Sequence, residues 1–168
     1  MITKQFNKIN DNHADAIKRI CSGYEFNEQR AEELYQEVMT SIWQSLCNFK
    51  NECSLKTWSY RVAYNKCISH SVKESKKNEI SLSTIEDIEH LLSSGEFDKK
   101  IVNKSLLEKI KDILKSIKPI DREVFLLFLE GESGKEIAAI SGLTESNVST
   151  KISRVKKLIS SIMEIENE

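Results

Sequence analysis

The stretch of residues 133–157, "SGKEIAAISGLTESNVSTKISRVKK", decides the fold of the C-terminal part of the chain. Ser133 and Glu136 stand three residues apart, directly before an apolar run, which is the capping-box spacing at the start of a helix. Gly142 stands where a sharp turn needs a positive φ, and Thr144 can cap a further helix. The stretch therefore predicts a helix, a tight turn and a second helix.

The second of these helices has two different faces. Its apolar stripe advances by four, three, four and three residues through Val148, Ile152, Val155, Ile159 and Ile162. The opposite face carries small hydroxyl residues followed by cations, namely Ser146, Thr150, Arg154, Lys157 and Ser161. A solvated outer face is the ordinary alternative. However, the spacing of Ala138, Gly142 and Val148 suits two helices crossing over a tight turn, and the cations favour DNA contact.

Composition predicts an all-α protein, because 168 residues include a single Pro and only five Gly. No apolar run is long enough to span a membrane and no secretory signal is visible, so we expect a cytoplasmic protein without membrane insertion. The four cysteines form no C-x-x-C pair and are expected to be reduced and mostly packed. Cys67 and His70 could share a helix face, but two ligands make no metal site, and no metal or cofactor is expected.

The charge is unevenly distributed although the formal net charge is only −1. Residues 61–77 contain five Lys or Arg against one Glu, and residues 144–157 contain four against one. Residues 86–98 contain five acidic residues and no Lys or Arg. This pattern predicts two small helical domains, 1–78 and 104–168, joined by a flexible polar linker over 79–103, with the helix-turn-helix in the second.

Periodic apolar residues place helices in both domains. In the first domain, the inward positions are expected at Leu34, Val38, Ile42, Leu46 and Phe49, and further on at Trp58, Val62 and either Cys67 or Ile68. In the second domain, Pro119 is expected to break a helix, Asp121 to cap the next one and Gly131 to end it.

Two segments together resemble a known family. Residues 31–70, with Trp43, Phe49, "TW-Y" at Thr57, Trp58 and Tyr60, and "A-N" at Ala63 and Asn65, are similar to region 2 of bacterial RNA polymerase sigma factors. Residues 117–159 are similar to region 4 of the same proteins. The order, the spacing and the linker resemble the extracytoplasmic-function (ECF) group of the sigma-70 family, which keeps only these two regions.

The resemblance implies a non-enzymatic subunit that binds core RNA polymerase and directs promoter recognition and melting. Glu33, Gln36 and Glu37 would dock on the clamp helices of the largest polymerase subunit, and the polymerase flap would be a further contact. For each of these three residues, the alternative is an ordinary solvent-exposed helix face. An anti-sigma factor, common in the group, is a candidate partner.

The resemblance also assigns residues to promoter DNA. The loop from Phe49 to Ser54 would capture a base flipped from the minus-ten element, with Asn51 and Ser54 as hydrogen-bonding edges. The melted strand would be lined by Lys56, Trp58, Tyr60, Arg61 and Asn65, although Trp58 is equally expected in a core. The minus-thirty-five duplex would be met by Ser146, Ser149, Thr150, Lys151, Arg154 and Lys157.

Two departures from the family pattern reduce the phosphate contacts. Ser149 stands where relatives often carry a basic residue, and the segment after region 2 has fewer Arg. Weak intrinsic DNA affinity is therefore expected, with the polymerase supplying most of the binding energy. A stand-alone helix-turn-helix regulator is the main alternative function. A small DNA recombinase is a third, disfavoured function. It would need a nucleophile among clustered arginines, and the chain has only five scattered Arg.

Overall fold

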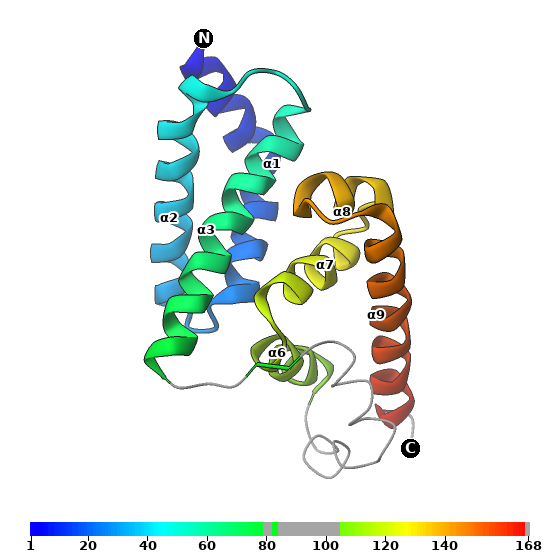
Figure 1. The fold of residues 1–168 in the computed structure, drawn as a ribbon. Helices are drawn as coiled ribbons and strands as arrows, with labels where there is room; N and C mark the ends of the chain where they lie inside the picture. The colour runs from blue at the N-terminus through cyan, green and yellow to red at the C-terminus, as the bar shows by residue number, and fades with distance from the viewer. Residues whose placement is uncertain (79–81, 84–104, 167–168) are drawn as a thin grey trace.

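The computed structural model of the chain describes residues 1–78, 82–83 and 105–166, and these residues are almost entirely helical (Figure 1). The predicted all-α class is confirmed. Three helices come from the N-terminal part of the chain and four from the C-terminal part, and the two groups lie against each other.

The N-terminal group consists of α1 (Ile2–Tyr24), α2 (Glu28–Ser45) and α3 (Leu55–Lys77), with the short 3-10 helix η1 (Leu46–Asn48) after α2. Caps set the starts of α2 and α3. The Asn27 side chain accepts a hydrogen bond from the Arg30 amide, and the Ser54 hydroxyl accepts one from the Thr57 amide. All three helices pack against one another.

The predicted inward face of α2 is confirmed, whereas that of α3 is partly wrong. Leu34, Val38, Ile42 and Leu46 are buried, while Phe49, beyond the end of α2, is only half-buried. On α3 the buried aromatic and small side chains are Tyr60, Ala63, Tyr64 and Cys67, while Trp58, Val62 and Ile68 are only half-buried. The reason is that α3 packs against α7 and α8 as well as α1 and α2, so contacts distant in sequence select its buried positions.

The C-terminal group consists of α6 (Leu106–Ser116), α7 (Pro119–Leu129), α8 (Gly134–Ser141) and α9 (Glu145–Glu166). A full capping box, formed by Ser105 and Glu108, starts α6. The prediction that Asp121 caps α7 is wrong. Pro119 is the first residue of α7 after the N-cap Lys118, and Asp121 is buried inside the helix bundle.

The predicted helix, turn and helix is present as α8 and α9. Ser133 caps α8 by accepting from the Glu136 amide at 3.2 Å, and Thr144 caps α9 by accepting from the Asn147 amide at 3.2 Å. Gly142 ends α8 with a φ of 74°, as its position in the turn requires. The Glu136 carboxylate does not complete the expected capping box, because it accepts a hydrogen bond from Thr57 of α3 instead.

One hydrophobic core continues across both groups. Its buried residues include Tyr60 and Tyr64 of α3 together with Val124, Leu127 and Ile137 of α7 and α8. A second cluster joins α6, α7 and α9. Of the expected linker over 79–103, only residues 82 and 83 are described, and Ser83 exchanges main-chain hydrogen bonds with Ser116 and Lys118. The remainder lies outside the described residues.

Candidate polymerase and nucleic-acid interfaces

The outer face of α9 carries most of the side chains expected at the minus-thirty-five element. Its apolar stripe packs inward, since Val148, Val155 and Ile162 are buried. In Figure 1, α9 runs along the edge of the molecule remote from α2. The hydroxyl and basic residues with exposed side chains there are Ser146, Ser149, Thr150 and Lys157, while Arg154 is half-buried. A helix with this exposed face can enter a major groove.

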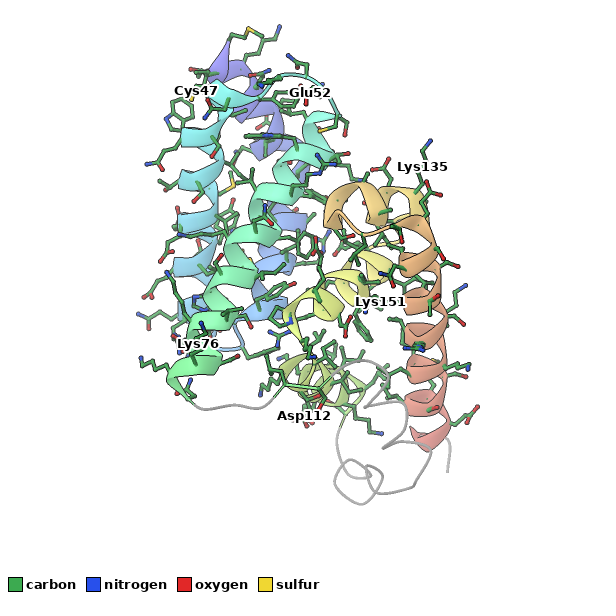
Figure 2. The ribbon with its side chains drawn as sticks, in the orientation of Figure 1. Cys47, Glu52, Lys76, Asp112, Lys135 and Lys151 are labelled. Atoms are coloured by element: carbon green, nitrogen blue, oxygen red, sulfur yellow. The ribbon has the colours of Figure 1, made fainter. Side chains whose placement is uncertain are left out.

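Lys151 does not share that outer face. It is three residues after Val148 and four before Val155, which places it toward the buried side, between α7 and α9 (Figure 2). Its ammonium forms an ion pair with the carboxylate of Asp121, which is only 1% exposed. Lys151 thus lies apart from the outward side chains of α9 and its charge compensates a buried carboxylate, while its contact with the minus-thirty-five duplex stays a prediction.

The loop expected to capture a flipped base lies between η1 and α3. Asn51 has a φ of 58°, a left-handed conformation that is uncommon for a residue other than glycine. Phe49 packs against Trp58 with ring centroids 5.1 Å apart. This aromatic pair borders a hollow of about 430 Å³, whose charged lining residues are Lys50, Glu52 and Arg61. The loop therefore combines aromatic and basic side chains beside an open hollow, which suits an unpaired nucleotide.

A second hollow, of about 420 Å³, borders the same loop and is lined there by Asn51 and Ser54. Its opposite wall is the first part of α1, with Lys4, Gln5 and Lys8. Reasoning from the sequence missed these three residues. They are far from the loop along the chain, and no local periodicity connects them with it.

The expected strand-lining residues of α3 separate into two groups. Lys56, Arg61 and Asn65 reach the surface, and Trp58 is half-buried against the core. Tyr60, in contrast, is only 4% exposed, and burial raises the pKa of its phenol to about 12. In this structure the Tyr60 ring belongs to the core that continues into the C-terminal group, and its contact with the melted strand stays a prediction.

The C-terminal helices cover part of this α3 surface. Arg61 Nε donates to the main-chain oxygen of Ala139 at 2.6 Å. The Lys56 ammonium lies 2.5 Å from a carboxylate oxygen of Glu132, just before α8. Two residues expected to hold single-stranded DNA are thus bound to the C-terminal group.

The residues expected to bind polymerase lie together on α2. Glu33, Gln36 and Glu37 are all exposed, and α2 lies on the side of the molecule remote from α7–α9 (Figure 1). Glu37 forms an ion pair with Lys66 of α3 at 3.1 Å. Trp43 follows on this helix, 43% exposed, with its ring edge-on to Phe6. This surface is acidic with one exposed aromatic side chain.

Other site chemistries have little support in the described part of the chain. No group of three or more His, Cys, Asp or Glu side chains there could hold a metal ion. The His70 Nε2 atom lies 3.1 Å from a carboxylate oxygen of Glu25. The Cys21 and Cys67 thiols are buried, with sulfur atoms 3.9 Å apart, whereas Cys47 is exposed. Over the same residues, no helix combines the length and apolar character needed to cross a bilayer.

Comparisons with known proteins agree with this arrangement of helices. Residues 11–77 match the family model of sigma-70 region 2, and residues 107–159 match that of sigma-70 region 4. The sigma factor SigV of Bacillus subtilis is 26% identical over 147 residues, which cover 88% of this chain and 84% of SigV. The sigma-H factor of Pseudomonas aeruginosa is 26% identical over 138 residues, covering 78% of this chain and 72% of that protein.

A solved structure shows the same fold. It is that of CnrH in complex with the cytosolic domain of CnrY; it has a TM-score of 0.63 and 16% identity, and covers 95% of this chain and 87% of CnrH. By sequence, CnrH of Cupriavidus metallidurans is 20% identical over 173 residues, covering 98% of this chain and 90% of CnrH. With region 2 followed by region 4 and relatives of this kind along most of its length, the chain belongs to the sigma-70 family, in the ECF group of sigma factors that bind RNA polymerase for transcription initiation.

Proposed function

We propose that this sigma factor binds core polymerase, the minus-ten strand and the minus-thirty-five duplex through three separate surfaces. The exposed acidic face of α2 binds core polymerase. The loop at residues 49–54, with the adjoining end of α3, holds the minus-ten strand. The outer face of α9 enters the minus-thirty-five duplex. The observation that carries this division is that the three surfaces lie on different helices and each is exposed at least in part.

The polymerase contact rests on Glu33, Gln36 and Glu37. All three point away from the core of the N-terminal group, so they can dock without unfolding any helix. Carboxylates at such a surface steer association with a basic partner more than they add to affinity. The clamp helices of the largest polymerase subunit are the proposed partner, and the flap is the proposed partner of the C-terminal group.

The minus-ten contact uses Asn51 and Ser54 in the loop together with Lys56, Arg61 and Asn65 on α3. Cations and an aromatic wall are the usual means of holding a single strand without strict sequence preference. Phe49 and Trp58 form that wall in this chain.

The minus-thirty-five contact uses Ser146, Ser149 and Thr150 near the start of α9, with Arg154 and Lys157 further along. Small hydroxyl side chains allow close approach to base edges, and the cations lie where the helix passes the phosphates. Lys151 acts indirectly, since its ion pair with Asp121 fixes α9 against α7.

The packed arrangement of the two groups is proposed to be a closed state that opens when DNA and polymerase bind. Domains 1–78 and 104–168 are the bodies that separate. In the closed state Arg61 and Lys56 are bound by the C-terminal group, so they cannot hold a strand. Among the residues that the structure describes, two buried side-chain atoms have no hydrogen-bond partner, the Tyr64 hydroxyl and Arg122 Nε. Each such atom costs about 1–3 kcal/mol, which limits the stability of the closed state.

A protein that holds the closed state is the proposed regulator. CnrH, which shares this fold, was solved in complex with the cytosolic domain of CnrY. A comparable anti-sigma partner could bridge the two groups of this chain and keep the α3 surface covered. The proposed site of action is the cytoplasm, where polymerase works, and no catalytic role is assigned to any residue.

The test is to mix the purified protein with core RNA polymerase and map transcript starts on genomic DNA. A discrete set of starts that requires this protein is expected. A gel shift with and without core enzyme then separates a sigma factor from a stand-alone regulator. Tight sequence-specific duplex binding without core enzyme, and no new starts with it, would contradict the proposal.

A further inference from the structure

The hollow between the loop at residues 49–54 and the start of α1 has features of a binding site. Its volume of about 420 Å³ lies within the roughly 300–1,000 Å³ typical of small-ligand sites. One wall is the loop, with Phe49, Asn51 and Ser54, and the other is α1, with Lys4, Gln5 and Lys8. An aromatic ring, two amide side chains and two cations therefore surround one space.

The loop wall is held in an unusual conformation. Asn51 adopts the left-handed region with a φ of 58°, and such residues concentrate where the surrounding structure positions a functional group. The Ser54 hydroxyl is less available for hydrogen bonding to a base than its position in the loop suggests. Its hydroxyl caps α3 by accepting from the Thr57 amide at 3.0 Å, and it also lies 2.7 Å from the Thr57 hydroxyl. A second amide, that of Gln5, is the better complement to Asn51.

The α1 wall contributes positive charge that does not stabilise α1 itself. Lys4 and Lys8 are four residues apart, so they lie on one face of α1, where like charges disfavour the helix by a few tenths of a kcal/mol. Both are exposed, and within the described residues neither forms an ion pair with a carboxylate. An anion in the hollow would relieve this repulsion.

The positive charge extends from α1 toward α3. Burial and then the charges of Lys56 and Lys8 lower the pKa of His13, while the charge of Glu132 raises it, which indicates that these charged groups act on the same region. Lys56 is one of the proposed strand contacts on α3. The α1 lysines and a proposed strand contact thus act on one region, where Lys56 is paired with Glu132 in the packed arrangement.

We propose that the start of α1 forms the second half of the pocket for the flipped minus-ten nucleotide. Gln5 contacts an edge of the extruded base opposite Asn51, and Lys4 and Lys8 contact the phosphates on either side of it. This inference rests on the proposed function, because it presupposes that the loop at residues 49–54 receives an unpaired nucleotide. It adds three residues that sequence reasoning did not assign to DNA.

The test uses holoenzyme assembled with core RNA polymerase and a fork-junction DNA whose minus-ten non-template strand is single-stranded. The K4Q/K8Q variant is compared with the wild type and with K111Q/K118Q, which removes two exposed lysines of the C-terminal group. Loss of two single-strand phosphate contacts should weaken DNA binding and reduce the salt slope, log K against log [salt], by roughly 1.4. The control variant should keep the wild-type slope.

Two further variants separate contact from folding and base from backbone. K4R/K8R keeps both charges and should restore the salt slope if phosphate contact is the cause. Q5A should keep the slope but alter discrimination among the four bases at one minus-ten position, by about fivefold or more. Circular dichroism and thermal melting confirm that each variant is folded before DNA is added.

The outcomes distinguish the inference from the function on which it rests. If wild-type holoenzyme does not bind the fork junction, the proposed function fails. If it binds and K4Q/K8Q keeps both affinity and salt slope, the role of α1 fails while the function stands. If the K4Q/K8Q defect lies in affinity for core polymerase, with an unchanged DNA salt slope, Lys4 and Lys8 contact the polymerase and the inference is overturned.

Discussion

Arg61 on α3 donates a hydrogen bond from Nε to the main-chain oxygen of Ala139 on α8, at 2.6 Å. The guanidinium of a proposed DNA contact is thereby bound to the helix that precedes the proposed recognition helix α9. Neighbouring contacts reinforce the relationship. Lys56 pairs with Glu132, and Arg19 of α1 makes two hydrogen bonds to Glu130, at 2.6 and 2.9 Å. Acidic residues of the C-terminal group therefore form ion pairs with Lys56 and Arg19 of the N-terminal group.

Neutralising those acidic residues should favour the open state. Glu130, Glu132 and Glu136 each contact the N-terminal group, and none is a proposed DNA or polymerase contact. Changing all three to Gln should weaken closure by about 1–2 kcal/mol, because partly exposed ion pairs contribute at most about 1 kcal/mol each. The free protein should then show a larger radius of gyration in X-ray scattering and several-fold tighter binding of minus-ten single-stranded DNA.

The matched control removes the same charge elsewhere. Glu28, Glu33 and Glu164 are exposed and are not among the acidic residues just named, so their change to Gln raises the net charge equally. A comparable gain in DNA affinity for both triple variants would show that net charge, and not opening, is responsible. An unchanged radius of gyration in the first variant would exclude a closed state held by these ion pairs.

Local sequence signals predicted the helix-turn-helix because they act within a few residues. Ser133, Gly142 and Thr144 each behave as expected, since a cap or a positive φ depends on the adjoining backbone. The α2 stripe was predicted for the same reason, as one helix face meets one core. Asp121 shows the limit. A proline two residues earlier started the helix, which left the carboxylate to be buried and paired with Lys151.

Contacts between distant segments could not be predicted from periodicity. α3 packs against helices on more than one side, so its sequence contains no single apolar stripe, and Tyr60 was assigned to DNA although it is buried. The α1 wall of the proposed nucleotide pocket was missed for a related reason. Lys4, Gln5 and Lys8 have no distinctive spacing, and only folding places them beside Asn51.

Glu37→Ala tests the polymerase surface. Glu37 is exposed and its pair with Lys66 spans two surface helices, so the free energy of unfolding should change by less than about 1 kcal/mol. Affinity for core polymerase should nevertheless fall by about five- to tenfold, mainly through slower association at low salt. Surface plasmon resonance with immobilised core enzyme measures both rates. Glu28→Ala on the same helix is the control, and equal losses for the two variants would contradict the assignment.

Arg154→Ala tests the outer face of α9. The side chain follows Thr150 by one helical turn on the face opposite the buried stripe, where it can reach a phosphate or a guanine edge. Loss of one such contact should reduce transcription from promoters that depend on the upstream element by about tenfold. The same holoenzyme should retain its activity on a premelted minus-ten template. An equal loss on both templates would place Arg154 in polymerase binding instead.

Glu123→Gln tests the buried carboxyl at the contact between the groups. Glu123 is 2% exposed on α7, and burial raises the pKa of its carboxyl to about 7 from the ordinary 4.5. Its charge lies close enough to raise the pKa of Tyr24 and Tyr64, although burial is the main cause for both phenols. Glu123 is therefore close to Tyr24 of α1 and Tyr64 of α3. Ionisation of its carboxyl should weaken the packing of α7 on these two helices.

The sign of the pH effect follows from proton uptake. Between about pH 4.5 and pH 7 the folded protein holds the Glu123 proton that the unfolded chain releases, so the free energy of unfolding falls as pH rises. Glutamine carries no charge at any pH. The variant should therefore match the wild type near pH 4.5 and exceed it by up to roughly 3 kcal/mol at pH 8. Urea unfolding across this range measures the difference, with Glu164→Gln as the exposed control. Parallel pH curves for wild type and Glu123→Gln would mean that the carboxyl is already hydrated, and that the contact of α7 with α1 and α3 is open in solution.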